Sequence, residues 1–272
     1  MSESSKSIVI TSAVRTPIGA FKGSLKDIEA KDLGALVTKE ALKRSHLNSK
    51  EVDELIMGQV LTSATGQNPA RQAAIQSGIP IEKTAYVINQ VCGSGLRAVA
   101  SGYQSIKSDD AKIIIAGGQE SMSKTPHTIF LQEKKKLEES NLVDTMIKDG
   151  LWDAFNGYHM GVTAENVANK WQITRKDQDD FALSSQLKAE QAQKKNKFKD
   201  EIVPAIFNGE KKLDIDEHPR PGMTLDRLSK LKPSFKSDGT VTAGNASGIN
   251  DGAAAVVLMS DEEAKKRSLK PL

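Results

Sequence analysis

The sequence predicts an α/β fold, a layered α-β-α arrangement in which helices cover the faces of a mostly parallel, five-stranded mixed sheet. Short apolar runs alternate along the chain with segments in which apolar residues recur every three or four positions. This alternation is typical of strands and helices that follow one another in α/β proteins. In the middle of the chain the alternation stops, so we expect a mixed α/β insertion there.

Five apolar runs are the expected strands of the sheet. Each is short and rich in aliphatic residues, and turn residues such as Gly78-Ile79-Pro80 and Gly117-Gly118 separate them from their neighbours. These features are typical of buried strands. In chain order the five runs cover residues 7–14, 52–60, 86–88, 111–116 and 253–260. A further short strand is expected within the insertion, at residues 201–207.

The expected helices lie between these strands and in the insertion. Asn68-Pro69 opens one of them, because proline is well placed in the first turn of a helix. Thr174 to Asp177 resembles a capping box, which marks the start of another. In chain order the helical patterns cover residues 31–44, 69–77, 96–106, 163–171, 174–196 and 261–267. Residues 210–237 are rich in Lys, Pro and Asp and are expected to form a loop.

These elements imply two parts of the chain. We expect residues 7–122 and 240–272 to form the α/β core, and residues 123–239 to form the insertion. In mostly parallel sheets ligands gather at the carboxyl ends of the strands. Cys92 and the segment 117–122 are both expected at that edge.

Composition limits the classes of function. With 272 residues, 38% hydrophobic and 27% charged, the chain is globular in composition, and its net charge of +3 gives no argument for a nucleic-acid partner. One cysteine excludes an internal disulfide, and no Cys/His pairs have zinc-like spacing, so no metal is expected. No apolar run is long enough to span a membrane, and the first residues do not resemble a secretion signal. We therefore expect a cytoplasmic protein, the alternative being import into an organelle with removal of a presequence.

The single cysteine, Cys92, is the leading candidate for chemistry. It lies between the predicted strand 86–88 and the helix that follows, beside the turn-forming residues Gly93-Ser94-Gly95. Unpaired N–H groups in a first helical turn favour an anion, so they would favour the thiolate and stabilise a negative acyl oxygen. From these residues alone a second interpretation stays open, in which Cys92 is a small buried side chain and the glycines serve packing.

Four sequence blocks, in this order, resemble the N-terminal half of a thiolase. They are Asn-Gln-Val-Cys-Gly-Ser-Gly-Leu-Arg-Ala at 89–98, Gly-Gly-Gln-Glu-Ser-Met-Ser at 117–123, residues 158–166 and residues 242–255. The resemblance runs from about Ile8 to the end of the chain. The form Cys-Gly-Ser-Gly, with Asn and Gln before it, is similar to the acetoacetyl-CoA (biosynthetic) branch, whereas a degradative 3-ketoacyl-CoA thiolase is the alternative.

The resemblance implies a reversible Claisen condensation in which two acetyl-CoA molecules give acetoacetyl-CoA and free CoA. Cys92 would carry the acyl group as a thioester, and its backbone N–H would form part of the oxyanion hole. Coenzyme A would be a substrate, with no covalently bound cofactor and no metal. The positions that the resemblance assigns to CoA binding are Leu151, His159, Met160, Arg220, Phe235, Ala243, Ser247 and Gly248.

Within that set the resemblance implies different contacts. His159 and Met160 would line the pantetheine tunnel, and Arg220 and Phe235 would lie near the adenine end. The remaining positions are a pocket wall and groups along the pantetheine, namely Leu151, Ala243, Ser247 and Gly248. The structural alternatives are a hydrogen-bonded histidine, a turn cap at Ser247 and a surface charge at Arg220. Glu120 and Met122 are expected to be core or supporting groups.

The sequence also departs from the family pattern. A thiolase has a second half with a histidine in a Gly-His-Pro motif and a second cysteine in a Cys-x-Gly-Gly-Gly motif, and neither motif occurs in these 272 residues. Without them the α-proton of the substrate has no evident base. We therefore expect an apolar face that a partner covers, either a second copy in a homo-oligomer or a C-terminal half. Residues 125–140 fall where the branch carries its tetramer loop but lack its usual glycines, which leaves dimer and tetramer open. The alternative of another class is a CoA-binding or scaffolding fragment without turnover.

Overall fold

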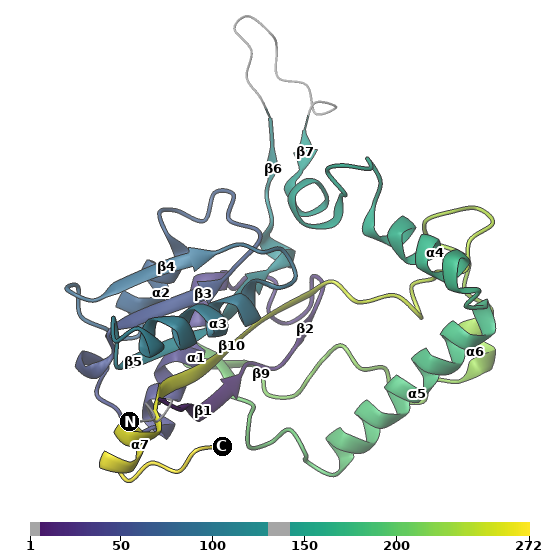
Figure 1. The fold of residues 1–272 in the computed structure, drawn as a ribbon. Coiled ribbons are helices and arrows are strands. Elements are labelled where there is room, and N and C mark those ends of the chain that lie inside the picture. The colour runs from purple at the N-terminus through teal and green to yellow at the C-terminus, as the bar shows by residue number, and fades with distance from the viewer. Residues whose placement is uncertain (1–5, 130–141) are drawn as a thin grey trace, which may run out of the picture. The chain divides into compact units, whose positions relative to one another are not determined.

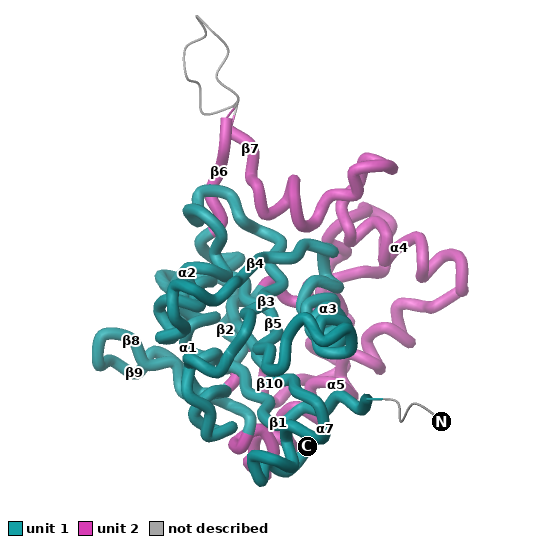
Figure 2. The backbone as a smooth tube through the Cα atoms, turned by 60° about the vertical axis from the view of Figure 1, so that its left-hand side comes forward, with its two compact units in different colours: residues 1–124, 201–215, 250–272 teal, residues 125–200, 216–249 magenta. Residues whose placement is uncertain are grey.

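The computed structural model describes residues 6–129 and 142–272 (Figure 1). The chain divides into two compact units, which Figure 2 distinguishes by colour. Unit 1 comprises residues up to 124 together with 201–215 and 250–272, and unit 2 comprises 125–200 and 216–249. Most of the expected tetramer-loop segment, residues 130–140, lies outside the described residues.

Unit 1 contains a sheet that is mixed and mostly parallel, as predicted. Its strand order is β1-β10-β5-β3-β4, and the short strand β2 also pairs with β10. Because β10 is antiparallel to both of its neighbours while β3 is parallel to β4 and β5, every strand of this path except β10 runs in the same direction. The strands are β1 (Ile8–Arg15), β2 (Gly19–Ala20), β3 (Glu54–Gly58), β4 (Thr84–Ile88), β5 (Ile113–Ser121) and β10 (Asn250–Ser260).

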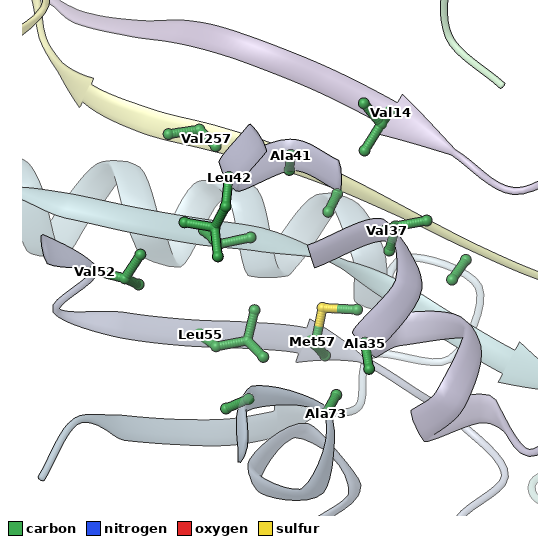
Figure 3. Packing of buried hydrophobic residues seen from close by; sticks show 14 of the residues in the cluster. Val14, Ala35, Val37, Ala41, Leu42, Val52, Leu55, Met57, Ala73 and Val257 are labelled. Carbon is green, nitrogen blue, oxygen red and sulfur yellow. The ribbon is translucent and has the colours of Figure 1, made fainter. Parts of the chain in front are cut away.

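The helices of unit 1 form the outer layers of the α-β-α arrangement. One core joins α1, α2 and α7 to one face of the sheet, and Figure 3 shows Ala35 and Val37 of α1 beside Met57 of β3. A second core joins α3 to the opposite face through Ala98 and Ile106. The helices are α1 (Ala30–Arg44), α2 (Pro69–Gln76), α3 (Ser94–Lys107) and α7 (Asp261–Lys266), with short 3-10 turns at Ser49–Glu51 and Met122–Lys124.

Two segments differ from the predicted division: residues 201–215, expected in the insertion, pack with unit 1, and residues 240–249, expected in the core, belong to unit 2. The N–H of Arg15 donates to the carbonyl of Glu201 (2.9 Å), and the N–H of Val203 donates back to the carbonyl of Arg15 (2.8 Å). Val203 and Ala205 are buried in the larger core. Such backbone pairing between distant segments cannot be deduced from local periodicity, so the boundary was not visible in the sequence.

Unit 2 is built around two helices, α4 (Met160–Trp171) and α5 (Arg175–Lys194). Thr174 begins α5 with the predicted capping box, because its side chain accepts from the N–H of Asp177 and the Asp177 carboxylate accepts from the N–H of Thr174. The unit also contains the π-helix Met146–Leu151, the helix α6 (Leu225–Ser229) and the strand pair β6 (His127–Thr128) and β7 (Val143–Asp144).

The expected loop at residues 210–237 is partly ordered. It holds β9 (Glu210–Leu213), which pairs with β8 (Ala205–Phe207), and it holds α6, whose first turn Thr224 caps. Both elements are too short for a hydrophobic period to be recognised in the sequence. The sequence of β9 is also charged, and it becomes extended through pairing with β8. Within residues 6–129 and 142–272, no helix has the length and apolar character that a bilayer crossing needs.

Candidate functional site

Cys92 lies in the tight turn between β4, which ends at Ile88, and α3, which begins at Ser94. Val91 has a φ of 48°, a left-handed conformation that is an outlier for a β-branched residue. The side chain of Asn89 accepts from the N–H of Val91 (2.9 Å), and the N–H of Gly93 donates to the carbonyl of Gln90 (3.0 Å). These bonds hold the strained backbone of the turn in place. The turn presents Cys92 at the surface, where its side chain is exposed. The alternative of a small buried cysteine is therefore wrong.

Ser94 fixes the turn from inside the helix. Its hydroxyl donates to the carbonyl of Val91 (2.6 Å) and accepts from the N–H of Gln90 (2.9 Å), and the residue is buried. Gly93 at the N-cap position has no side-chain acceptor for the first helical turn. The positive end of the α3 dipole therefore lies beside Cys92 with no side-chain cap, which is a setting that stabilises an oxyanion.

Glycine at position 58 permits the close approach of α3 to the end of β3. A Cβ at Gly58 would lie 2.4 Å from the backbone N of Gly95 and 2.4 Å from the carbonyl carbon of Ser94. No side chain fits at that distance, so the start of α3 rests directly on the backbone of β3. Gly58 is not recognisable from the sequence as a contact residue, because an isolated glycine at a strand end carries no signal of what approaches it.

Two side chains of β5, Gln119 and Glu120, bind the segment that follows β3. The Glu120 carboxylate accepts from the N–H groups of Val60 (2.9 Å) and Leu61 (3.3 Å). The Gln119 side-chain amide donates to the Gln59 side-chain oxygen (2.9 Å), and both glutamines are buried. Burial raises the pKa of Glu120 to about 7, the two N–H donors oppose that rise, and the charge of Asp251 adds to it.

In unit 2, His159 is held by two contacts. Its Nδ1 accepts from the N–H of Gly161 (3.0 Å), a bond that caps α4, so Nε2 is the ring nitrogen left to donate to another group. Its ring stacks on Phe235, with ring centroids 4.9 Å apart and planes inclined by 20°. Glycine at 161 leaves room for this stack, since a Cβ there would lie 2.2 Å from the Phe235 ring.

The structure thus gives Phe235 a position that the resemblance did not. Phe235 was assigned with Arg220 to the adenine end, yet its ring lies against the imidazole of His159. Arg220 is exposed, and its backbone N–H donates to the Gln186 side chain (2.9 Å). Phe235 therefore helps to fix the orientation of the His159 imidazole.

Leu151 and Met160 flank a short hairpin that leads to His159. Trp152 pairs with His159 in an antiparallel bridge, and the N–H of Asp153 donates to the carbonyl of Tyr158 (2.7 Å). Leu151 precedes this hairpin at the end of the π-helix, and Met160 follows it as the first residue of α4. The hairpin brings three of the predicted residues, Leu151, His159 and Met160, into one neighbourhood.

The segment 240–248 carries the predicted residues Ala243, Ser247 and Gly248, and two buried acids anchor it. The Glu165 carboxylate accepts from the N–H groups of Thr240 (2.9 Å) and Val241 (2.8 Å). Burial raises the pKa of Glu165, but these backbone donors outweigh burial, so its pKa lies below the ordinary value. The side chain of Asn245 donates to Asp179 (3.0 Å), a buried residue that also pairs with Arg175.

These anchors are residues that the sequence analysis missed. Glu165 and Asn245 stand in two of the quoted blocks, but their spacing along the chain does not reveal that both serve one segment. Ala243 and Ser247 are exposed, and Gly248 is partly buried. All eight predicted CoA residues belong to unit 2, whereas Cys92 belongs to unit 1. No group of His, Cys, Asp and Glu that could hold a metal ion occurs in the part of the chain that the structure describes.

Comparison with known proteins gives consistent matches along the whole chain. Residues 8–262 match the family described as the thiolase N-terminal domain. The acetyl-CoA acetyltransferase of Rhizobium meliloti (strain 1021) is 57% identical over 272 residues, which cover 99% of this chain and 69% of that protein. The cytosolic acetyl-CoA acetyltransferase of Rattus norvegicus is 51% identical, with 100% of this chain and 70% of that protein covered.

A solved structure also matches over the whole chain. The crystal structure of the Bacillus anthracis acetyl-CoA acetyltransferase has a TM-score of 0.94 and 40% sequence identity to this chain. The match covers 100% of this chain and 70% of that one.

Proposed function

This chain belongs to the thiolase family, whose N-terminal domain it contains, and from that premise we propose that it is the acyl-accepting part of an acetyl-CoA C-acetyltransferase. The observation that carries the proposal is the exposed Cys92 on a strained turn before an uncapped helix. Relatives at 51% and 57% identity are named acetyl-CoA acetyltransferase, which supports the same activity here.

In the first step the Cys92 sulfur attacks the thioester carbonyl of acetyl-CoA. The carbonyl oxygen becomes an oxyanion beside the first turn of α3, and its collapse expels the CoA thiolate and leaves an acetyl group on Cys92. In the second step the α-carbon of another acetyl-CoA, after loss of a proton, attacks the acetyl carbonyl. Acetoacetyl-CoA forms and the Cys92 thiolate is released, so the bonds balance without a redox partner or a metal.

Coenzyme A is the substrate group that unit 2 would hold. His159 presents an Nε2–H donor of fixed orientation, and the exposed Ala243 and Ser247 lie on a segment that Glu165 and Asp179 anchor. Preorganised donors on a rigid segment suit the amide groups of a pantetheine chain. Leu151, Met160, Phe235 and Gly248 complete the proposed CoA contacts, with Arg220 at the anionic adenine end.

The base that removes the α-proton is proposed to come from outside these 272 residues. The family uses a second cysteine and the histidine of a Gly-His-Pro motif for these proton transfers. The sequence holds a single cysteine and no Gly-His-Pro motif. We propose a partner that supplies them, either a C-terminal half or a second copy, which covers the apolar side chains of α3. Leu96 is 77% exposed and Tyr103 is 46% exposed on that helix, in keeping with an unpartnered face. A cytoplasmic location is proposed with this function, since the rat relative is named cytosolic.

Intact-protein mass spectrometry after incubation with acetyl-CoA tests the first step. We expect an acetyl adduct on the wild type and none on Cys92→Ser, because the chain has a single thiol. A folded wild type that binds CoA without any adduct, and whose binding is indifferent to Cys92→Ser, would contradict the proposal and favour a binding or scaffolding fragment. Faster transfer from long-chain acyl-CoA than from acetyl-CoA would favour a degradative 3-ketoacyl-CoA thiolase.

A further inference from the structure

We propose that Glu120 is a positioning residue for Cys92, because its carboxylate fixes the segment after β3 on which the Cys92 turn rests. Val60 and Leu61 stand where the ladder between β3 and β5 has ended, since its last pair is Gly58 with Gly118. Glu120 on β5 replaces the missing strand carbonyls, because its two oxygens accept from the N–H groups of Val60 (2.9 Å) and Leu61 (3.3 Å).

The segment 59–61 connects this carboxylate to both ends of the Cys92 turn. The N–H of Gln59 donates to the carbonyl of Ile88 (3.1 Å), the last residue of β4 before the turn. Gly58, one residue earlier, lies against the backbone of Ser94 and Gly95 at the start of α3. A shift of residues 59–61 therefore moves the strand that enters the turn and the support of the helix that leaves it.

A second side chain binds the same segment without a charge. Gln119 donates to the side chain of Gln59 (2.9 Å), and Gln59 in turn donates to the carbonyl of Leu61 (2.9 Å). These amide bonds do not change with pH. Among the bonds that the described part of the chain, residues 6–129 and 142–272, makes to residues 59–61, those of Glu120 alone depend on ionisation. An amide or a protonated carboxyl presents one strong acceptor to two N–H groups.

Ionisation of Glu120 costs free energy in the folded chain, because the carboxylate is buried and lies near a second acid. Burial raises its pKa to about 7, and Asp251 on β10 is the charged group that adds to the rise. The Asp251 carboxylate accepts two hydrogen bonds from Ser123, one from its N–H (2.9 Å) and one from its hydroxyl (2.5 Å). A neutral side chain at 120 would avoid this cost, but it would offer one strong acceptor instead of two to the N–H groups of Val60 and Leu61.

The inference rests on the proposed role of Cys92, but its test does not require acetyl-CoA. Iodoacetamide alkylates a thiolate directly, forming a sulfur–carbon bond and releasing iodide, and this chain has a single cysteine to report. We would measure the alkylation rate of wild type, Glu120→Gln and Glu54→Gln between pH 5.5 and 8.5. Glu54 is the matched control, because it lies on β3 at the opposite end of the sheet and accepts from Thr84.

The ratio of the wild-type rate to the Glu120→Gln rate is the decisive quantity, since ionisation of the same thiol contributes to both rates. We expect a ratio near one below about pH 6 that rises to roughly threefold or more at pH 8.5, the effect of one lost charge-assisted hydrogen bond. Its midpoint should lie near pH 7, where Glu120 ionises. A ratio of one at every pH, or a constant ratio above one, would overturn the proposal, and Glu54→Gln should stay at one.

A second measurement needs no variant and so does not depend on how Glu120→Gln folds. Amide hydrogen exchange of Val60 and Leu61 in the wild type, corrected for intrinsic exchange and compared with the amides of β5, should show protection relative to β5 that rises between pH 6 and pH 8. Protection that does not change across this range would overturn the proposal. If the acetyl-CoA experiment fails while this pH dependence is found, the proposed activity is wrong and the positioning role of Glu120 stands.

Discussion

At the scale of the residue, the turn at Cys92 combines a strained backbone conformation with side-chain hydrogen bonds that stabilise it. Val91 adopts a left-handed conformation that costs energy for a β-branched side chain. Asn89 and Ser94 compensate through side-chain hydrogen bonds to the turn backbone. Because an unsupported strained turn would relax, these bonds keep the thiol at the surface and next to the first turn of α3.

Glu120 also gives a prediction about stability at this scale. Its pKa rises from 4.5 to about 7 on folding, so between these values the folded chain keeps a proton that the unfolded chain has released. The folded state then binds more protons, and stability falls as pH rises from about 4.5 to about 7. The loss from this one group is about 3 kcal/mol.

Urea unfolding at pH 5 and pH 8 would measure this loss. In Glu120→Gln the carboxyl is absent, so the difference in unfolding free energy between the two pH values should be smaller than in wild type by about 3 kcal/mol. Glu54→Gln serves as the control with the same chemical change on the same sheet. Equal pH dependence in wild type and Glu120→Gln would contradict the raised pKa.

At the scale of the element, the contact between β3 and α3 depends on the absence of a side chain at position 58. Gly58→Ala would place a Cβ 2.4 Å from the Gly95 N, so helix and strand must separate, and we expect destabilisation of about 1–3 kcal/mol. Gly95→Ala is the matched control on the facing element. A Cβ there would meet its nearest neighbour, the carbonyl oxygen of Gly117, at an ordinary 3.9 Å.

Thermal unfolding of the two variants would test this prediction. Gly95→Ala should differ little from wild type, since alanine also favours the helix. Equal melting temperatures for Gly58→Ala and wild type would show that the two elements are not in close contact. A larger loss in Gly95→Ala than in Gly58→Ala would contradict the assigned geometry.

At the scale of the whole molecule, the exposed apolar side chains of α3 predict association. Leu96 and Tyr103 lie on one helical face and are 77% and 46% exposed, so a partner that covers them gains hydrophobic free energy. In sedimentation velocity we expect the wild type to self-associate and Leu96→Glu to shift toward the monomer. Gln104→Glu adds the same charge to an exposed neighbour and should leave association unchanged. A wild type that stays monomeric at high concentration would contradict a homo-oligomer and favour a C-terminal half as the partner.

Local sequence patterns were sufficient for the order of the main elements. The apolar runs predicted β1, β3, β4, β5 and β10, and Asn68-Pro69 and the Thr174 capping box predicted the starts of α2 and α5. They also placed Cys92 between a strand and a helix. These signals are local because capping, proline placement and periodicity involve residues within one or two turns of each other.

What the sequence determined by itself was therefore the fold class, the family blocks and the position of the one thiol. Only the tertiary structure decided that residues 201–215 pack with unit 1, that Phe235 stacks on His159, and that Glu120 binds Val60 and Leu61. Each of these contacts joins segments that are distant in the chain, and each depends on strand register and on the way loops return. Register is set by the packing of the entire sheet, so no local pattern contains it.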